Sequence, residues 1–426
     1  MTKIQVPRPW RWLTLLLLLS ACGGGGGGGG SGTGPSPSPS PSPPPEAGPL
    51  SLTVVNGWGP ASLAAASSFE VWADVQPLSE VVTGWTGGTV TSDADEWHAT
   101  AMAGNTPPTL TANKLQVPVN FETLIYRTPT TVGKTARFFI PAAPKGLVLM
   151  LHGSGGTSAF IERTESRYLA LKAISQGYAV LAPEAEESVA GDLDGDGKQR
   201  WNVPLSLSNV DLQSLNALLD GLYLAGRLPA GLPQYVLGMS NGGSMAVALA
   251  AVGDTNGAAA FPRLRFKAAV SYCAQARADA VAVTRTPTAW YLCGNDDNAE
   301  VSNTNAQANS ASLAGRGVPT AALLHAATPL YDERFLRVLG VSLAQSGALS
   351  AELRAAGMLD AAGFFNLASA DVAARATASL ASFPVLMAMT ATQQRGVISQ
   401  IAVMRAEHEM YADWAGRTLR WFAAYP

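Results

Sequence analysis

Short apolar segments alternate with helical patterns over residues 117–426. Residues 166–177 and 210–224 carry apolar side chains at helical spacing. Around them lie nearly continuous apolar runs, which are typical of strands buried on both faces of a sheet: GLVLMLHG, YAVLAPEA, QYVLGMS, FKAAVSYC and TAWYLCG. Two earlier segments, NFETLIYRTP and KTARFFIPA, are predicted to pair as antiparallel strands. The alternation predicts an α/β domain, in which a mostly parallel sheet is covered by helices on both faces.

A second pattern occupies residues 50–116. Its short runs LSLTVV, SFEVWADV and TLTANKL alternate as half-buried strands do, and Gly, Pro, Asn and Ser separate them. We predict a small all-β module here. This stretch resembles the internalin-like bacterial surface β-repeat, which implies a spacer or an arm that binds a surface or carbohydrate. Four tryptophans could form such a platform, although burial in a core is the favoured interpretation: Trp58, Trp72, Trp85 and Trp97.

Residues 1–22 have the pattern of a secretion signal. A basic start precedes an apolar run, Leu13 to Leu19, that is too short to span a bilayer. The ending Leu-Ser-Ala-Cys resembles the bacterial lipobox, which implies an extracytoplasmic protein anchored through a lipid on Cys22. Gly23 follows the cysteine, and by similarity to Gram-negative lipoproteins this implies the outer membrane. An ordinary cleaved signal is the alternative. Residues 23–49 form a Gly-rich and Ser-Pro-rich linker.

Composition narrows the class of partner. Of 426 residues, 47% are hydrophobic and 14% are charged, and the net charge is −3. The chain can therefore form a sizeable core outside the linker. It contains no basic stripe or nucleic-acid-binding motif, so we expect no nucleic-acid partner.

The segment Gln234–Ala246, QYVLGMSNGGSMA, has the strongest chemical signal. An apolar strand, a turn with the pattern G-x-S-x-G, and a helical segment follow one another. In this context the pattern indicates a nucleophile elbow, which exposes a serine hydroxyl at the N-terminus of a helix. Ser240 is the predicted nucleophile. The alternative is an ordinary glycine-rich turn.

The partners of Ser240 are predicted from position along the chain. The sequence His152-Gly-Ser-Gly-Gly follows a buried strand, where an α/β-hydrolase places one oxyanion donor, so we assign the backbone N–H groups of Ser154 and Asn241 to the oxyanion hole. His152 is interpreted as a residue that orients this loop. For the acid, Asp297 is favoured over Asp296, because a G-x-x-D spacing from Gly294 reaches it.

The base is predicted to be a histidine near the C-terminus. The chain has four histidines: His98, His152, His325 and His408. His408 precedes a final amphipathic helix and is favoured over His325, which is expected at the end of the eighth strand. The order Ser240, Asp297, His408 is that of the α/β-hydrolases. An imidazole is needed because a serine hydroxyl is a weak nucleophile until a base takes its proton.

LVLMLHGSGGT, GMSNGGSMA, FKAAVSYCA and GKQRWNVPLSLSNVDLQSLNALLDGL resemble the polyhydroxybutyrate-depolymerase and feruloyl-esterase branch of the α/β-hydrolases. The resemblance covers residues 140–300 and resumes at His408. Residues 330–399 depart from it with an Ala- and Leu-rich helical pattern, which we interpret as an inserted helical cap over the Ser240 pocket.

Two weaker signals remain. Residues 192–197, DLDGDG, look like the first half of a calcium loop, but Val203 stands where the bidentate glutamate belongs, so a polar surface loop is favoured and no metal site is assigned. Cys273 and Cys293 end neighbouring strands and can be a disulfide or two buried thiols.

These features predict a secreted, lipid-anchored serine esterase that needs no cofactor. Its substrate is a small or polymeric carboxylic ester. The alternatives are an extracellular polyester depolymerase and a surface-binding lipoprotein that uses the hydrolase domain as a scaffold.

Overall fold

The computed structural model describes residues 48–426, except residues 77, 128–132 and 256. The expected signal, the lipidation site Cys22 and most of the linker lie outside the described residues. Residues 48–426 form one compact unit. None of the helices in the described part of the chain is both long and apolar enough to cross a bilayer.

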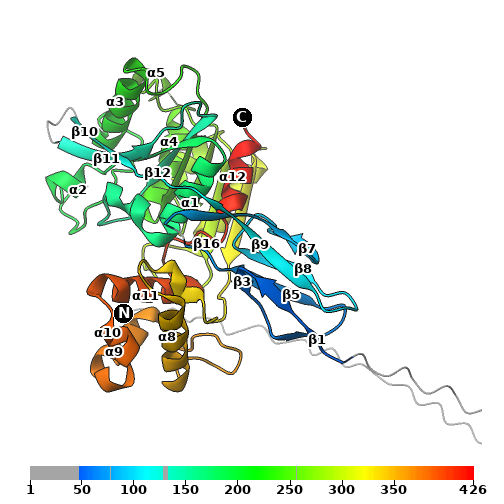
Figure 1. Cartoon of the computed structure of the whole chain (residues 1–426). Coiled ribbons are helices and arrows are strands. Elements are labelled where there is room, and N and C mark those ends of the chain that lie inside the picture. Colours follow the sequence, from blue (N-terminus) through cyan, green and yellow to red (C-terminus); the bar gives the residue numbers. More distant parts are fainter. Residues whose placement is uncertain (1–47, 77, 128–132, 256) are drawn as a thin grey trace, which may run out of the picture. The chain divides into compact units, whose positions relative to one another are not determined.

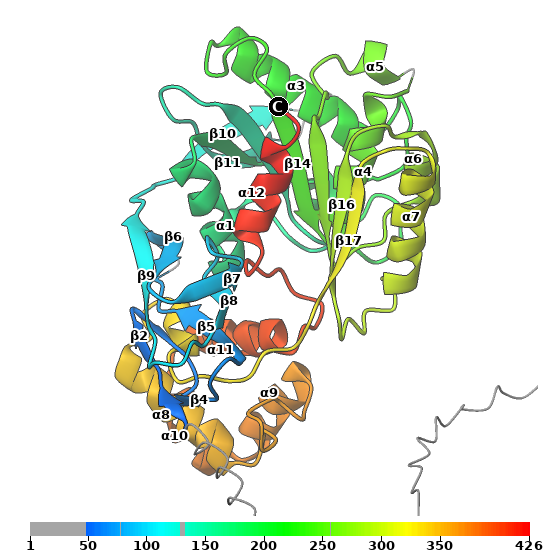
Figure 2. The same cartoon turned by 90° about the vertical axis from the view of Figure 1, so that its right-hand side faces the viewer.

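An eight-stranded sheet forms the centre of this unit (Figures 1 and 2). Its strand order, β10-β11-β13-β12-β14-β15-β16-β17, fits an α/β-hydrolase-like fold. The pairs β10–β11 and β11–β13 are antiparallel, as expected for the first pair, and all later pairs are parallel. The strands are β10 (Glu122–Arg127), β11 (Gly133–Phe139), β12 (Gly146–Leu151), β13 (Tyr178–Ala182), β14 (Gln234–Met239), β15 (Ala268–Tyr272), β16 (Thr288–Cys293) and β17 (Thr320–His325).

Helices cover both faces of the sheet, as the continuous apolar strands predict (Figure 2). Side chains alternate across a strand. On β12, Val148 and Met150 pack with α1 (Thr164–Ser175) and α12 (Ala415–Ala423). Leu147 and Leu149 pack on the other face, with α3 (Val210–Leu224) and α4 (Asn241–Val252). The shorter or peripheral helices are η1 (Ser158–Glu162), α2 (Glu187–Ala190), α5 (Gly257–Ala260), α6 (Ala278–Val283) and α7 (Asn303–Gly315).

Among the described residues before β10, the regular elements are all strands, and they form three small sheets. The strands are β1 (Leu50–Ser51), β2 (Thr53–Val55), β3 (Gly57–Trp58), β4 (Ser62–Leu63), β5 (Ser68–Ala73), β6 (Glu80–Thr86), β7 (Thr89–Ser92), β8 (His98–Met102) and β9 (Thr109–Gln116). Their apolar side chains belong to the same core cluster as α1 and α12, so this segment shares its core with the α/β part. Three of the four candidate platform tryptophans are buried, as favoured, and only Trp58 is half-buried.

Residues 330–404 are helical and have a core cluster of their own. We call this part of the chain the helical insertion. In Figures 1 and 2 it lies beyond the end of the sheet, next to the N-terminal strands. Its elements are η2 (Arg334–Arg337), α8 (Leu343–Ala355), α9 (Ser369–Ala378), η3 (Leu380–Ser382), α10 (Pro384–Ala388) and α11 (Ala391–Met404).

Candidate active site

Ser240 lies in a strained turn between β14 and α4. Its φ is 57° and its ψ is −127°, a backbone conformation that is unfavourable for a residue with a side chain. The turn is tight because α4 passes close to two strands. A Cβ on Gly238 would lie 2.2 Å from the carbonyl oxygen of Gly242, and one on Gly242 would lie 2.3 Å from that of His152. The Ser240 hydroxyl makes no capping bond to α4 and is therefore available to another partner.

That partner is His408. Its Nε2 lies 2.9 Å from Ser240 Oγ, and its Nδ1 lies 2.8 Å from Oδ2 of Asp296. The Asp296 side chain is only 1% exposed, and its other oxygen, Oδ1, accepts the backbone N–H of Asn298 at 3.1 Å. Serine, imidazole and carboxylate thus form a hydrogen-bonded chain.

The acid in this chain is Asp296 and not Asp297, which corrects the prediction from the G-x-x-D spacing. Asp297 is exposed. Asp296 is directed to His408 by the residue before it, Asn295. The backbone N–H of Asn295 donates to the carbonyl oxygen of Ala406, and its side-chain amide donates to that of Arg405. These bonds hold the turn after β16 against the segment that leads to His408, and they direct Asp296 to the imidazole.

His325 has a different environment. It is buried at the end of β17, with its Nε2 3.4 Å from Asp413, and its ring stacks on Tyr411. Burial lowers the pKa of His325 to about 4. The structure therefore brings His408, and not His325, to Ser240.

The predicted oxyanion segments both adjoin Ser240. Gly153 is so close that a Cβ built on it would lie 3.2 Å from the Ser240 Cβ, and Ser154 lines the same cavity as Ser240. Asn241 is the first residue of α4, where backbone N–H groups point out of the helix.

His152 holds the oxyanion loop, residues 152–156, in place through both nitrogens of its ring. Its Nδ1 lies 2.7 Å from the carbonyl oxygen of Gly153, and its Nε2 accepts the backbone N–H of Ala185 at 3.1 Å. Burial lowers the pKa of His152 to about 4, so the ring is neutral at pH 7, with the proton on Nδ1. These contacts agree with its interpretation as a loop-orienting residue.

Trp201 connects the two oxyanion segments, and the sequence did not single it out. Its indole N–H donates to the carbonyl oxygen of His152 at 2.9 Å, and its backbone N–H donates to Oδ1 of Asn241 at 2.7 Å.

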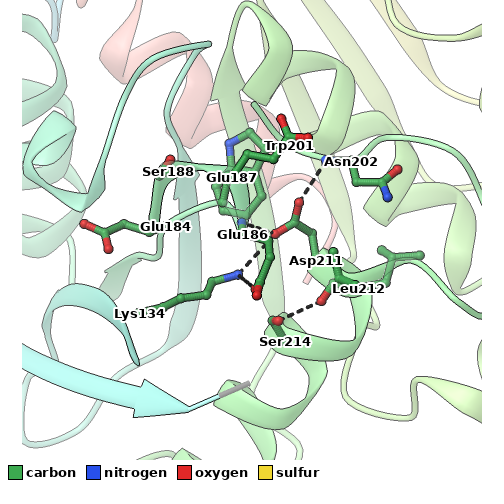
Figure 3. Close-up of polar contacts among 12 residues, drawn as sticks. Lys134, Glu184, Glu186, Glu187, Ser188, Trp201, Asn202, Asp211, Leu212 and Ser214 are labelled. Atoms are coloured by element: carbon green, nitrogen blue, oxygen red, sulfur yellow. Dashed lines mark hydrogen bonds and ion pairs between the residues drawn. The ribbon is translucent and has the colours of Figure 1, made fainter. Parts of the chain in front are cut away.

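The backbone N–H groups of the two residues next to Trp201 also donate to side chains. The N–H of Arg200 donates to Glu187 at 2.9 Å, and that of Asn202 donates to Asp211 at 2.8 Å. Three successive backbone N–H groups thus have side-chain acceptors, in the region drawn in Figure 3. A tryptophan in a polar loop was the only signal.

A buried lysine supports this arrangement (Figure 3). Lys134, on β11, is 0% exposed and lies 3.1 Å from Asp211 and 3.2 Å from Glu186. Asp211 also accepts the backbone N–H of Glu186 at 2.7 Å. Burial raises the pKa of Asp211, and the Lys134 charge opposes that rise. The carboxylate that holds Asn202 therefore has a cationic partner.

The cavity in front of Ser240 has a volume of about 750 Å³ and a wall that is polar and apolar in equal measure. Besides Ser240 and His408, it is lined by the oxyanion loop, by residues of the 192–199 loop, and by Asn298, Glu300 and Glu409. Of the residues that the structure describes, none between 330 and 399 lines it. The helical insertion therefore does not cover this cavity, contrary to the expectation that it would.

An acidic loop lies beside the cavity. Among the described residues, it contains the only cluster of carboxylates close enough together to hold a metal ion. The carboxylates of Glu187, Asp192 and Asp194 lie within 4.8 Å of one another. Oxygen ligands of this kind suit a hard cation such as Ca²⁺. Asp192, however, already accepts the backbone N–H groups of Gly195 and Gly197, as a polar surface loop would.

Cys273 and Cys293 are joined as a disulfide, with Cα atoms 5.7 Å apart. This decides between the two possibilities left open by the sequence. Because Cys293 ends β16 directly before the turn that carries Asp296, the bond ties the base of this turn to the neighbouring strand, β15.

No protein-family model and no curated protein matches the sequence. Among solved structures, the chain is similar to the Pyrococcus furiosus esterase Pf2001 and to Thermogutta terrifontis esterase 2 phosphorylated by paraoxon. Each has a TM-score of 0.35 and 13% identity, over 48% of this chain and 82% of the other. The butyrate-bound form of the second enzyme has 11% identity and a TM-score of 0.35, with the same coverage. These similarities are too distant to bear on function, which rests on the geometry of the site.

Proposed function

We propose that the protein is a serine hydrolase that cleaves carboxylic esters. The observation that supports this most is the hydrogen-bonded chain from Ser240 through His408 to Asp296. A hydroxyl in a strained turn, an imidazole with both nitrogens engaged and a buried carboxylate are the parts that nucleophilic acyl transfer requires.

In the proposed reaction, Ser240 Oγ attacks the ester carbonyl carbon while its proton moves to Nε2 of His408. Asp296 holds the other ring proton and stabilises the imidazolium. The N–H groups of Ser154 and Asn241 stabilise the negative charge on the carbonyl oxygen. The bond between the carbonyl carbon and the alcohol oxygen then breaks, and His408 returns its proton to the leaving alcohol. Water attacks the acyl-enzyme in the same way and releases the acid and free Ser240.

The test is hydrolysis of p-nitrophenyl butyrate by the full chain and by Ser240→Ala. Loss of the nucleophile is expected to lower kcat by about 10⁴-fold or more. A fluorophosphonate probe should label the unaltered protein and not the variant. If the folded unaltered protein neither hydrolysed esters nor reacted with the probe, the scaffold alternative would replace this proposal.

On the signal-like pattern of residues 1–22, we further propose that the enzyme acts outside the cytoplasm, anchored by a lipid on Cys22. Labelling of the protein with a radioactive fatty acid in cells, and its loss in Cys22→Ala, tests this. Equal labelling of both would contradict it.

A further inference from the structure

A second cavity, which we call the side chamber, lies directly beside the catalytic cavity. Its volume is about 810 Å³. Phe160, Arg163 and Glu409 line both cavities and thus form their common wall. Glu409 follows His408 in the chain, and Met410 lines the side chamber, so this chamber begins within two residues of the proposed base.

The side chamber is built by four separate parts of the chain. Leu78 comes from the N-terminal β-segment, residues 159–166 from η1 and the start of α1, residues 338–339 and 390–399 from the helical insertion, and residues 409–410 from the segment that follows His408. Within the insertion, α11 packs closely on Val338, since a Cβ on Gly396 would lie 2.7 Å from one of its methyl carbons. The insertion that was expected to cover Ser240 therefore lines this neighbouring chamber instead.

The chemistry of the wall is mainly apolar. Apolar side chains line it from all four parts: Leu78, Ala159, Phe160, Val338, Leu339 and Met410. Of the polar side chains in the wall, Glu165 is engaged, because it accepts the side-chain amide of Gln400 at 2.8 Å and the backbone N–H of Ala412 at 2.8 Å.

Ser166 is the exception in this wall. It is only 1% exposed, and its hydroxyl has no hydrogen-bond partner among the described residues. A buried hydroxyl without a partner is unfavourable, and a ligand atom that bonds it removes that cost. The side chamber therefore has a mainly apolar surface, and among the polar side chains in its wall Ser166 is the one with a buried hydroxyl that has no partner among the described residues.

We propose that the side chamber binds a long apolar group of the ester substrate, with a hydrogen-bonding atom near its far end that meets Ser166. The proposal rests on the proposed function, because the ester must lie at Ser240 while its apolar group passes the wall formed by Phe160, Arg163 and Glu409. Both the acyl part and the alcohol part of an ester can carry such a group, and the experiment separates them.

The perturbation is Ala159→Phe. Ala159 is exposed, lines the side chamber and does not line the catalytic cavity, so the added ring can occupy the chamber without displacing a core side chain. Each methylene buried in an apolar site strengthens binding by about fourfold. Ala311→Phe is the matched control, because Ala311 is an exposed residue of α7 that lines neither cavity.

The substrates are p-nitrophenyl acetate, p-nitrophenyl octanoate and octyl acetate. If the acyl part enters the chamber, the full chain is expected to have a higher kcat/KM for p-nitrophenyl octanoate than for p-nitrophenyl acetate, which has the same leaving group. Ala159→Phe is expected to lower kcat/KM for the ester whose long chain enters the chamber by about tenfold or more and to leave p-nitrophenyl acetate unchanged. A loss on p-nitrophenyl octanoate alone assigns the chamber to the acyl part, and a loss on octyl acetate alone assigns it to the alcohol part. Ala311→Phe should change none of these values.

Ser166→Ala tests the anchoring point. It is expected to lower kcat/KM for p-nitrophenyl 8-hydroxyoctanoate by about fivefold, in line with the loss of one hydrogen bond, and to leave p-nitrophenyl octanoate unchanged. If the ratio between these two substrates did not change, Ser166 would not be the anchor.

Failure of this proposal is distinguishable from failure of the proposed function. If the protein hydrolysed p-nitrophenyl acetate and Ala159→Phe affected no ester, the side chamber would not be a substrate site, and the esterase would stand. If no ester were hydrolysed, binding of p-nitrophenyl octanoate to Ser240→Ala would be compared with its binding to the double variant that also carries Ala159→Phe. Weaker binding to the double variant would support the chamber, and equal binding would overturn it.

Discussion

The exchange Asp296→Asn tests the geometry at its most specific point. Oδ1 of Asp296 accepts the N–H of Asn298, and Oδ2 faces Nδ1 of His408. Asparagine has one oxygen and one NH₂ group. Because an NH₂ group opposite the N–H of Asn298 is unfavourable, the oxygen is expected to stay there and the NH₂ group to face His408. The NH₂ group then donates to Nδ1, so the ring proton moves to Nε2.

A proton on Nε2 prevents His408 from taking the proton of Ser240. The opposite amide orientation would bring two donors together at Asn298, at a cost of about 1–3 kcal/mol. Even in that orientation the neutral amide lacks the negative charge with which the carboxylate stabilises the imidazolium. In serine hydrolases with this arrangement, the same exchange lowers kcat about 10⁴-fold. This corresponds to about 5.4 kcal/mol of transition-state stabilisation, and we expect a loss of that size in Asp296→Asn.

The assay is kcat for p-nitrophenyl butyrate, with thermal unfolding to verify that the variant is folded. Asp297→Asn is the matched control, since the same exchange is made one residue away, on an exposed side chain. It should change kcat less than about twofold. A large loss in Asp297→Asn together with a small one in Asp296→Asn would refute the tautomer argument and restore the assignment made from the spacing.

Two further predictions follow from buried groups. Trp201→Phe removes the indole N–H that holds the carbonyl of His152, so we expect kcat for p-nitrophenyl butyrate to fall about 10- to 100-fold with little change in KM, and a change in KM alone would contradict a positioning role. The folded-state pKa values of His152 and His325, about 4, lie below the unfolded value of about 6.5. The unfolded state therefore binds more protons, and each imidazole lowers the free energy of unfolding by up to about 3 kcal/mol as the pH falls from 6.5 to 4. Thermal unfolding across this range should show a smaller decrease for His325→Gln than for the unaltered chain, and equal decreases would be evidence against the buried neutral ring.

Local sequence patterns were sufficient to predict those parts of the fold and of the site that depend on contacts between residues close in the sequence. The sheet strands were predictable because each is a short apolar run, and the turn at Ser240 because its glycines and its position between strand and helix are adjacent in sequence. The helical insertion was predictable from its spacing. Its position was not, because the chamber that it lines is completed by Leu78 and by residues 159–166, which are distant in sequence.

The choice between two adjacent aspartates shows the same limit. Spacing from Gly294 pointed to Asp297, but the turn is set by the bonds of Asn295 to residues 405 and 406, more than a hundred positions later. Trp201 was missed for the same reason, since its acceptors, His152 and Asn241, lie 49 and 40 positions away. No pattern within a short window contains this information.

Buried carboxylates explain how the loops around Ser240 can hold the proposed oxyanion donors in a fixed position. Glu184 accepts the N–H and the hydroxyl of Ser158, directly after the oxyanion loop, and Glu187 and Asp211 accept the N–H groups on either side of Trp201. A buried carboxylate is stable only when it is hydrogen-bonded or paired, so each of these loops is fixed when the protein folds. Donors fixed in this way need no reorganisation when charge develops on a substrate oxygen, which is the condition for strong electrostatic stabilisation of a transition state. In a site made of strands, the hydrogen bonds of the sheet hold the donors in place. In the loops beside Ser240, the hydrogen bonds to buried carboxylates do the same.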